Sequence, residues 1–118
     1  MTFHVELPPP PSVNRAFRNV PGKGRVKTRD YRTWRRDAVL EIYAQVRADK
    51  RIGGAVSVSI NLPATMRGDA DNRIKGLLDA LVASKRIDDD KHVATINVRR
   101  TAPGKMALIT VERDGMPA

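Results

Sequence analysis

The sequence predicts an α+β fold, in which a small mixed sheet of about four strands carries two helices. Two segments repeat apolar residues every three or four positions, as amphipathic helices do, and four others alternate apolar and polar residues, as half-buried strands do. Along the chain they follow one another as strand, long helix, strand, short helix, strand and strand. The 118 residues are about one domain's worth, so residues 1–118 are expected to form a single domain.

The first half of the chain holds one predicted strand and the longer predicted helix. Thr2–Leu7 alternates, and the proline run Pro8–Pro11 ends this strand because proline donates no hydrogen bond to a sheet. Ser12–Lys27 has no clear period, and we interpret it as a loop or an irregular hairpin. Asp30–Asp49 is the strongest helix, and its apolar stripe consists of Tyr31, Trp34, Ala38, Val39, Ile42, Tyr43 and Val46. We therefore assign the aromatic residues of this stripe to the core rather than to base stacking.

The second half of the chain contains the remaining elements. Ala55–Leu62 predicts a half-buried strand and Asn72–Ser84 the shorter helix. Val93–Val98 and Met106–Val111 predict two further strands. The Pro-Gly pair within Thr101–Lys105 is typical of a turn, so these last two strands are expected to pair as a hairpin.

Positive charge is concentrated in one part of the chain. The protein has 22 basic and 13 acidic residues, and residues 14–51 contain twelve of the basic residues but only four of the acidic ones. Such an excess indicates a polyanionic partner, with nucleic acid favoured over an anionic membrane. A solvated basic face is the alternative, but the segregation of the charge favours phosphate contacts. We expect these contacts from Asn14, Arg15, Lys23, Arg25, Lys27, Arg29 and Arg32.

Membrane and thiol chemistry are disfavoured. No segment has the roughly 18 consecutive apolar residues that a membrane span needs. No predicted helix combines a basic face with bulky apolar residues opposite, so no membrane partner is expected. The chain has no cysteine, which excludes disulfides, thiolate metal sites and a cysteine nucleophile. A cytoplasmic protein of bacterial type is the expectation.

Acidic residues gather at two places in the segment 67–91. Asp69 and Asp71 lead into the shorter helix, and Asp88–Asp90 precedes a predicted strand. Each feature has an ordinary explanation: a helix cap at Asp71 or its neighbour, a surface ion pair of Lys75 with Asp79, and a polar turn. Together they indicate more, because carboxylates repel the phosphates that a basic protein seeks unless a divalent cation lies between them. Metal-dependent phosphodiester hydrolysis requires this combination.

Two other chemistries fit the residues poorly. The Asp-x-Asp-Asn run at Asp69 is similar to the start of an EF-hand loop, but Ile74 stands where that loop needs glycine and Ala80 where it needs glutamate. A nucleophilic triad is also disfavoured, because neither His4 nor His92 has an obvious serine partner.

Several motifs in this chain follow the pattern of one known family. They are the block Asp69–Lys75, the triplet Asp79–Leu81 on the same helix, and the pair Asp89–Asp90 ahead of a strand. The start of the chain is also similar, with a strand, a proline cluster and an asparagine between Leu7 and Asn14, and Tyr31–Arg35 is similar to the family's helix opening. In these features, which cover most of its length, the chain resembles the RusA-type Holliday junction resolvases.

The resemblance implies a RusA-like homodimer that acts as a crossover junction endodeoxyribonuclease. Such an enzyme would resolve Holliday junctions by paired symmetric nicks during DNA recombination and repair. Mg²⁺ is the implied cofactor, with Mn²⁺ expected to substitute, and four-way branched DNA is the implied partner. The gene would be bacterial or phage-encoded. A non-catalytic basic DNA-binding module, whose aspartates only cap and turn, remains the alternative.

The resemblance also implies the roles of individual residues. Asp69, Asp71 and Asp90 match the metal-binding acids, and Lys75 matches the essential lysine, which makes these four the catalytic candidates. Asp90 is preferred because its spacing to the following strand matches the family. Asp89 remains the alternative third ligand, since three aspartates stand in a row.

Overall fold

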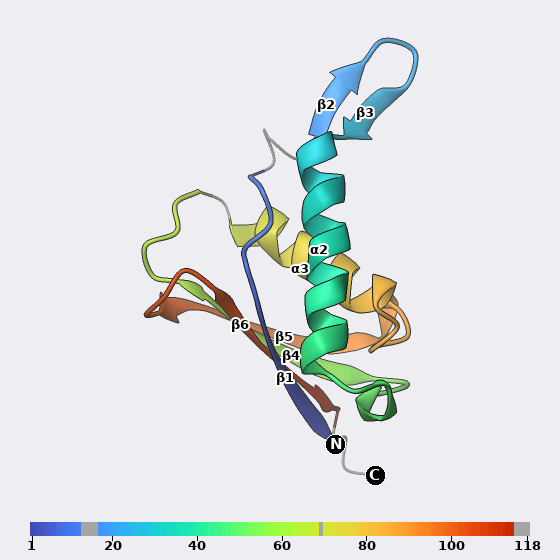
Figure 1. Cartoon of the computed structure of the whole chain (residues 1–118), viewed down its shortest axis with the longest axis vertical. Helices are drawn as coiled ribbons and strands as arrows, with labels where there is room; N and C mark the ends of the chain where they lie inside the picture. Colours follow the sequence, from blue (N-terminus) through green and yellow to red (C-terminus); the bar gives the residue numbers. More distant parts are fainter. Residues whose placement is uncertain (13–16, 69, 115–118) are drawn as a thin grey trace.

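A four-stranded sheet carries two helices on one face in the computed structural model, which describes residues 1–12, 17–68 and 70–114 (Figure 1). The sheet consists of β1 (Thr2–Leu7), β4 (Val56–Pro63), β5 (Val93–Ala102) and β6 (Ala107–Arg113). The helices are α2 (Arg29–Gln45) and α3 (Ala70–Ala83), and two short 3₁₀ helices are η1 (Ala48–Lys50) and η2 (Asp90–His92). The predicted α+β class, with two helices on a mixed sheet, is confirmed.

The strand order corrects one prediction. The strands lie in the order β1-β6-β4-β5, with β4 and β5 parallel and β6 antiparallel to both β1 and β4. The expected hairpin of the last two strands is therefore wrong, because β4 lies between them. A parallel pair needs a long crossover, and α3 supplies it between β4 and β5. The Pro-Gly turn then carries the chain past β4 to its other side.

The core lies between the helices and one face of the sheet. Along β4 buried and half-buried residues alternate, as expected for a strand with one covered face. The largest fully buried side chains include Leu7, Ile42, Ile60, Leu77, Leu81 and Ile109. Burial of each such side chain stabilises the fold by about 1.5–3 kcal/mol relative to exposure. This layer holds α3 and its acidic residues on the sheet.

The C-terminal part of α2 differs from the prediction. The helix ends at Gln45, four residues before Asp49, and Val46 takes an extended conformation. Arg86 Nε donates to the Val46 carbonyl at 3.1 Å, a bond from outside the helix. The assignment of Tyr43 to the core is also wrong: it is 48% exposed, and its ring lies under the guanidinium of Arg86.

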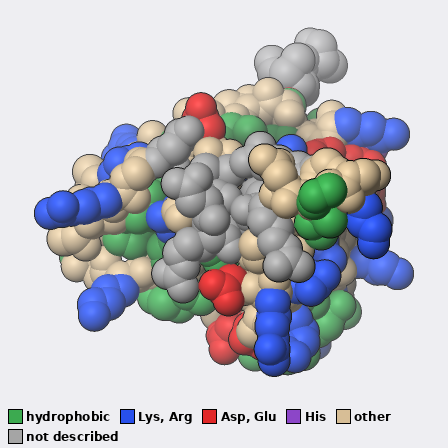
Figure 2. Space-filling view, turned by 90° about the horizontal axis from the view of Figure 1, so that it is seen from above, with side chains coloured by type: hydrophobic (Ala, Val, Ile, Leu, Met, Phe, Trp, Pro, Cys, Tyr) green, Lys and Arg blue, Asp and Glu red, His purple; other side chains and the backbone are tan. Residues whose placement is uncertain are grey.

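Between residues 17 and 27 the chain forms a hairpin, one of the two predicted alternatives. β2 (Phe17–Val20) pairs with β3 (Gly24–Lys27) in a separate antiparallel sheet. Gly22 and Gly24 have φ of +80° and +72°, a region that glycine adopts without strain. The hairpin projects beyond the N-terminal end of α2 (Figure 1). Viewed from that end, the surface carries many Lys and Arg side chains with acidic ones among them (Figure 2).

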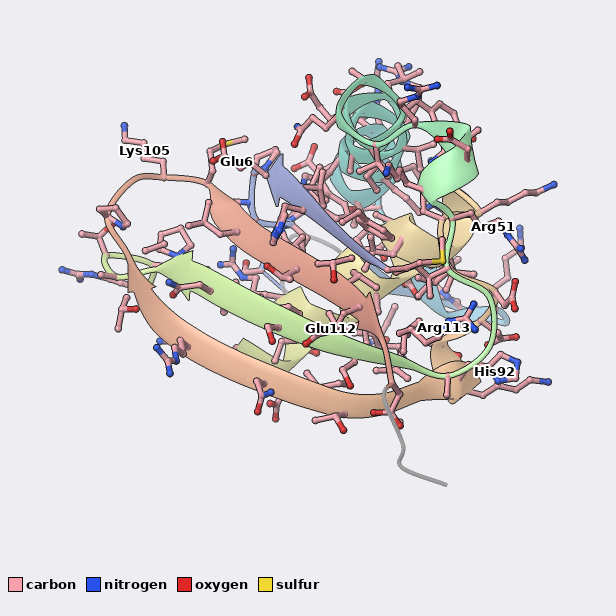
Figure 3. All side chains as sticks on the ribbon, turned by 90° about the horizontal axis from the view of Figure 1, so that it is seen from below. Glu6, Arg51, His92, Lys105, Glu112 and Arg113 are labelled. Carbon is pink, nitrogen blue, oxygen red and sulfur yellow. The ribbon has the colours of Figure 1, made fainter. Side chains whose placement is uncertain are left out.

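The opposite face of the sheet is open and polar (Figure 3). One row across it consists of His4, Thr110, Ser59 and Asn97, in register on β1, β6, β4 and β5. His4 Nδ1 lies 2.9 Å from Thr110 Oγ1. Glu6 and Lys105 lie at one end of this sheet, and His92, Glu112 and Arg113 at the other (Figure 3).

The edge strand β5 is the least covered element of the sheet. From Ala94 to Thr101 its residues are exposed, and they include Ile96 at 42% and Val98 at 39%. Both are in register with buried residues of β4, Val58 and Ile60, so they extend the apolar side of the sheet past the helices. Across the described ranges, no helix is long and apolar enough to cross a membrane.

Candidate functional site

Three charged residues share one face of α3. Asp71, Lys75 and Asp79 are each four residues apart, which places them in line along a helix. Asp71 lies in the first turn, where the helix dipole stabilises a negative charge. Asp71 and Lys75 are exposed and Asp79 is half-buried. At 1.5 Å per residue, Asp71 and Asp79 are about 12 Å apart along the helix axis.

The three consecutive aspartates that follow α3 have three different environments. Asp88 forms an ion pair with Arg51 and accepts from the Gly54 N–H at 2.9 Å, so it ties its loop to the segment before β4. Asp89 caps η2 by accepting from the Lys91 N–H at 3.2 Å. Asp90 is the first residue of η2 and is exposed. Two of the three carboxylates therefore make backbone contacts that shape the loop.

Negative charge converges on Asp90. A hydrogen bond with the Asp89 side chain raises the pKa of Asp90, and desolvation and the charges of Asp89 and Asp79 act in the same direction. The pKa of Asp89 is lowered, first by the backbone N–H of Lys91 and then by the Asp90 side chain. The α3 carboxylate whose charge acts on Asp90 is Asp79, two turns beyond Asp71.

Asp79 is fixed by a buried tyrosine. The hydroxyl of Tyr31 on α2 donates to Asp79 Oδ2 at 2.7 Å, and Tyr31 is only 3% exposed. Burial, followed by the hydrogen bond to Asp79, raises the pKa of Tyr31 well above its ordinary value of 10.0. The hydroxyl therefore stays protonated and donating in neutral solution. The sequence predicts a core position for Tyr31 and offers a surface ion pair with Lys75 as the ordinary explanation of Asp79, without connecting Tyr31 to Asp79.

A signal for this contact was present in the sequence. A tyrosine in the buried stripe of a helix needs a partner for its hydroxyl. Asp79 is an acid beside the apolar face of the only other predicted helix, so it was a reasonable candidate for the partner of the Tyr31 hydroxyl. What the sequence lacked was the crossing of α2 and α3, which sets the two side chains against each other.

The proline run lies across both helices and sets their relative position. Trp34 Nε1 of α2 donates to the Pro8 carbonyl at 2.8 Å, and Arg73 Nη1 of α3 donates to the Pro10 carbonyl at 2.7 Å. Gly76 of α3 faces Pro10 so closely that a Cβ on this glycine would lie 2.8 Å from the proline ring. The proline segment thus holds the acidic helix against α2.

The predicted phosphate-binding residues have different positions. Lys23, at the hairpin turn, and Arg29 and Arg32, in the first turn of α2, are exposed. Arg25 belongs to β3. Lys27 is half-buried, and its ammonium lies over the ring of Tyr31, 5.3 Å from the ring centroid. Asn14 and Arg15 lie outside the described residues.

The acidic residues meet part of the requirement for a divalent cation. Mg²⁺ takes oxygen ligands, often one or two carboxylates with water and phosphate, and the exposed carboxylates of Asp71 and Asp90 are oxygen donors of that kind. Among the residues that the structure describes, no group of three His, Asp or Glu lies close enough to hold an ion. Asp69 lies outside the described residues. The Gly68 carbonyl just before it accepts from Arg100 Nη2 at 3.1 Å, which ties that loop to β5.

Comparison with known proteins shows the relationship directly. Residues 6–112 match the family of the endodeoxyribonuclease RusA. The crossover junction endodeoxyribonuclease RusA of Enterobacteria phage HK97 is 31% identical over 104 residues, which cover 83% of this chain and 82% of the phage protein. These matches define the class as endodeoxyribonucleases, enzymes that cut within a DNA strand. The chain belongs to the RusA family, and the resemblance seen in its motifs is confirmed.

Proposed function

We propose that this protein resolves Holliday junctions by paired symmetric nicks, as a Mg²⁺-dependent homodimer that acts in DNA recombination and repair. The observation that carries the proposal is the family match over residues 6–112, which spans both acidic motifs and the basic hairpin. The phage relative is named for crossover junctions, and we extend that substrate to this chain. Bacterial or phage DNA recombines in the cytoplasm, where we place the enzyme.

In this proposal the basic residues hold the DNA. Lys23, Arg29 and Arg32 are exposed near the projecting hairpin, where they would neutralise phosphates of a junction arm. Phosphate contacts position the duplex without reading its bases. This arrangement suits an enzyme that recognises a branched shape.

The acidic residues would then act on the held strand. Asp69, Asp71 and Asp90 would hold the cation, which when bound supplies an activated water and stabilises charge on the phosphate. Asp90 is favoured over Asp89 because the Asp89 carboxylate already accepts the Lys91 N–H as a cap. Lys75 is exposed on the same helix face as Asp71, and it would stabilise the negative charge that develops on the cleaved phosphate.

A dimer follows from the symmetry of the substrate. A four-way junction has near two-fold symmetry, so two copies related by a two-fold axis would place two identical sites on opposed strands. The exposed apolar residues Ile96 and Val98 at the edge strand support association with a second copy, because isolated edge strands that carry apolar residues tend to pair.

The experiment that tests the function is cleavage of a synthetic four-way junction. The parent protein should nick opposed strands in Mg²⁺, lose activity when the metal is removed by EDTA, and regain it in Mn²⁺. Asp71→Asn should cut at least roughly 100-fold more slowly, because the substitution removes one carboxylate ligand of the proposed cation. Asp37→Asn is the matched control, since Asp37 is an exposed acid of α2 that pairs with Arg36.

The possible results separate the two readings of the sequence. Cleavage by neither the parent nor Asp71→Asn, with junction binding intact, would favour a non-catalytic DNA-binding module. Equal cleavage by both would remove Asp71 from the chemistry.

A further inference from the structure

Tyr31 contacts both the hairpin and the acidic face of α3. Its hydroxyl donates to Asp79 at 2.7 Å, and the ammonium of Lys27, the last residue of β3, lies 5.3 Å from its ring centroid. The residue is 3% exposed and belongs to the first turn of α2. One side chain therefore joins the projecting hairpin to a carboxylate of the acidic helix.

Asp79 connects the two acidic motifs in space. It lies on the face of α3 that also carries Asp71 and Lys75, and α3 packs against η2, which begins at Asp90. Its half-buried side chain has one oxygen bound to Tyr31. A hydrogen bond from a hydroxyl to a carboxylate is among the stronger hydrogen bonds. It therefore sets the direction in which the other carboxylate oxygen of Asp79 points.

We propose that Tyr31 is a positioning residue for strand cleavage, because its hydroxyl orients Asp79 within the acidic face while its ring anchors the base of the hairpin. This inference rests on the proposed function. Asp79 belongs to the family-like triplet Asp79–Leu81, and the inference gives it a part in the acidic face beyond the four catalytic candidates. Groups that orient the carboxylates of a metal site typically change activity or metal affinity about 10–100-fold when they are removed.

The hydroxyl of Tyr31 is not the main support of the helix packing. Trp34 and Arg73 bind the proline run independently, and the core side chains of both helices are fully buried. Removal of one oxygen atom should therefore leave the fold intact. A tyrosine that only tied α2 to α3 would influence stability alone, whereas a positioning tyrosine influences turnover and metal binding.

The first test is Tyr31→Phe, which removes the hydroxyl and keeps the ring under Lys27. We expect kcat for junction cleavage to fall about 10-fold or more, while the Kd for the junction stays within about threefold, because the basic hairpin is unchanged. The affinity for Mn²⁺ alone, measured by titration calorimetry without DNA, should fall several-fold. Tyr43→Phe is the matched control, since it removes an exposed hydroxyl from the same helix.

The second test is Asp79→Asn, which removes the charge but keeps an oxygen that accepts the Tyr31 hydrogen bond. This variant should fold like the parent, judged by its thermal midpoint, and should lose both cleavage and Mn²⁺ affinity by at least as much as Tyr31→Phe. It keeps the proposal testable if Tyr31→Phe proves poorly folded.

Several results would overturn the inference. One is that both variants match the parent in cleavage and in Mn²⁺ affinity. The other is that their loss of cleavage and affinity disappears once it is corrected for the folded fraction. If the parent cuts junctions and Asp71→Asn does not, while both new variants behave like the parent, the proposed function stands and only the role of Tyr31 fails. If the parent cuts no DNA, Mn²⁺ affinity still decides the role of Tyr31.

Discussion

Tyr31 and the three consecutive aspartates show how much depends on the partner of a single polar group. Asp88, Asp89 and Asp90 are chemically identical, yet the first binds Arg51 and Gly54, the second caps a 3₁₀ helix, and the third is exposed beside α3. A buried hydroxyl on Tyr31 likewise selects Asp79 from the acids of α3. The role of each side chain is therefore set by its contacts, and the direction of its pKa shift reports those contacts.

Tyr31 should make the stability of the protein depend on alkaline pH. The folded state holds the pKa of Tyr31 above its ordinary value of 10.0, so folded Tyr31 keeps its proton where the unfolded chain loses it. The stabilisation is fully present below about pH 10 and is lost as the pH rises toward the folded pKa. The free energy of unfolding of the parent relative to Tyr31→Phe should therefore shrink above pH 10.

Urea unfolding between pH 8 and pH 11 measures this difference. Tyr43→Phe serves as the control for loss of a hydroxyl at an exposed position. A difference between the parent and Tyr31→Phe that stayed constant over this range would contradict the raised pKa.

The proline segment and the hairpin differ in how they contact the two helices. The carbonyls of Pro8 and Pro10 accept bonds from α2 and α3, so the segment that ends β1 also aligns the two helices. The hairpin, in contrast, forms its own two-stranded sheet, and such isolated hairpins are only marginally stable. Its contact with Tyr31 through Lys27 gives it an anchor on α2.

Gly76→Ala should destabilise the fold although alanine favours helices. The gain in helix propensity is about 1 kcal/mol, whereas overpacking costs about 1–3 kcal/mol, and the new Cβ would lie under 3.0 Å from the Pro10 ring. We expect a net loss of about 1 kcal/mol in the free energy of unfolding, measured by denaturant titration. Gly104→Ala, which meets open space, should change stability by less than about 0.5 kcal/mol. A more stable Gly76→Ala variant would mean that Pro10 moves freely.

Lys23→Ala should weaken DNA binding through electrostatics alone. Lys23 is exposed at the hairpin turn, and each phosphate contact that is lost lowers the slope of log K against log salt by about one. The measurement is junction binding by fluorescence anisotropy at several salt concentrations. Lys105→Ala is the control, because Lys105 lies in the turn at one end of the sheet, away from the hairpin (Figure 3). An unchanged slope for Lys23→Ala would remove the hairpin turn from the DNA contact.

For the whole molecule, one face of the sheet is packed, the other is open, and one edge is uncovered. The helices bury the apolar side of β1, β6 and β4, but β5 extends past them with exposed Ile96 and Val98. The open face is lined by serine, threonine and asparagine, which solvate well. The acids of α3 and η2 belong to the helix-covered side, and the basic hairpin projects beyond it.

The proposed dimer should depend on the edge strand. Sedimentation equilibrium of the parent should give twice the mass of one chain. Ile96→Lys should shift the protein toward the monomer, because it places a charge where an apolar residue would be buried. Leu40→Lys alters an apolar residue of α2 that is 58% exposed, and it should leave the mass unchanged. A monomeric parent at micromolar concentration would refute the homodimer.

The local motifs of the candidate site could be predicted from the sequence, but its long-range contacts could not. The acidic motifs were visible because residue types at fixed spacings are local, and the resemblance to the RusA family rested on them. The contact of Tyr31 with Asp79 joins residues 48 apart, and that of Arg73 with Pro10 joins residues 63 apart. No spacing rule reaches that far.

The sequence alone predicts both helices, most strands, the class of fold, the concentration of positive charge and the family. Those properties are recorded in short-range patterns, because a helix or strand with one buried face must repeat its apolar residues at its own period. Four further features come from the three-dimensional contacts: β4 separates β5 from β6, Tyr43 faces solvent, the Lys27 ammonium lies over Tyr31, and Tyr31 holds Asp79. Each of these depends on the partner across the chain, and periodicity specifies that a face is buried without specifying what buries it.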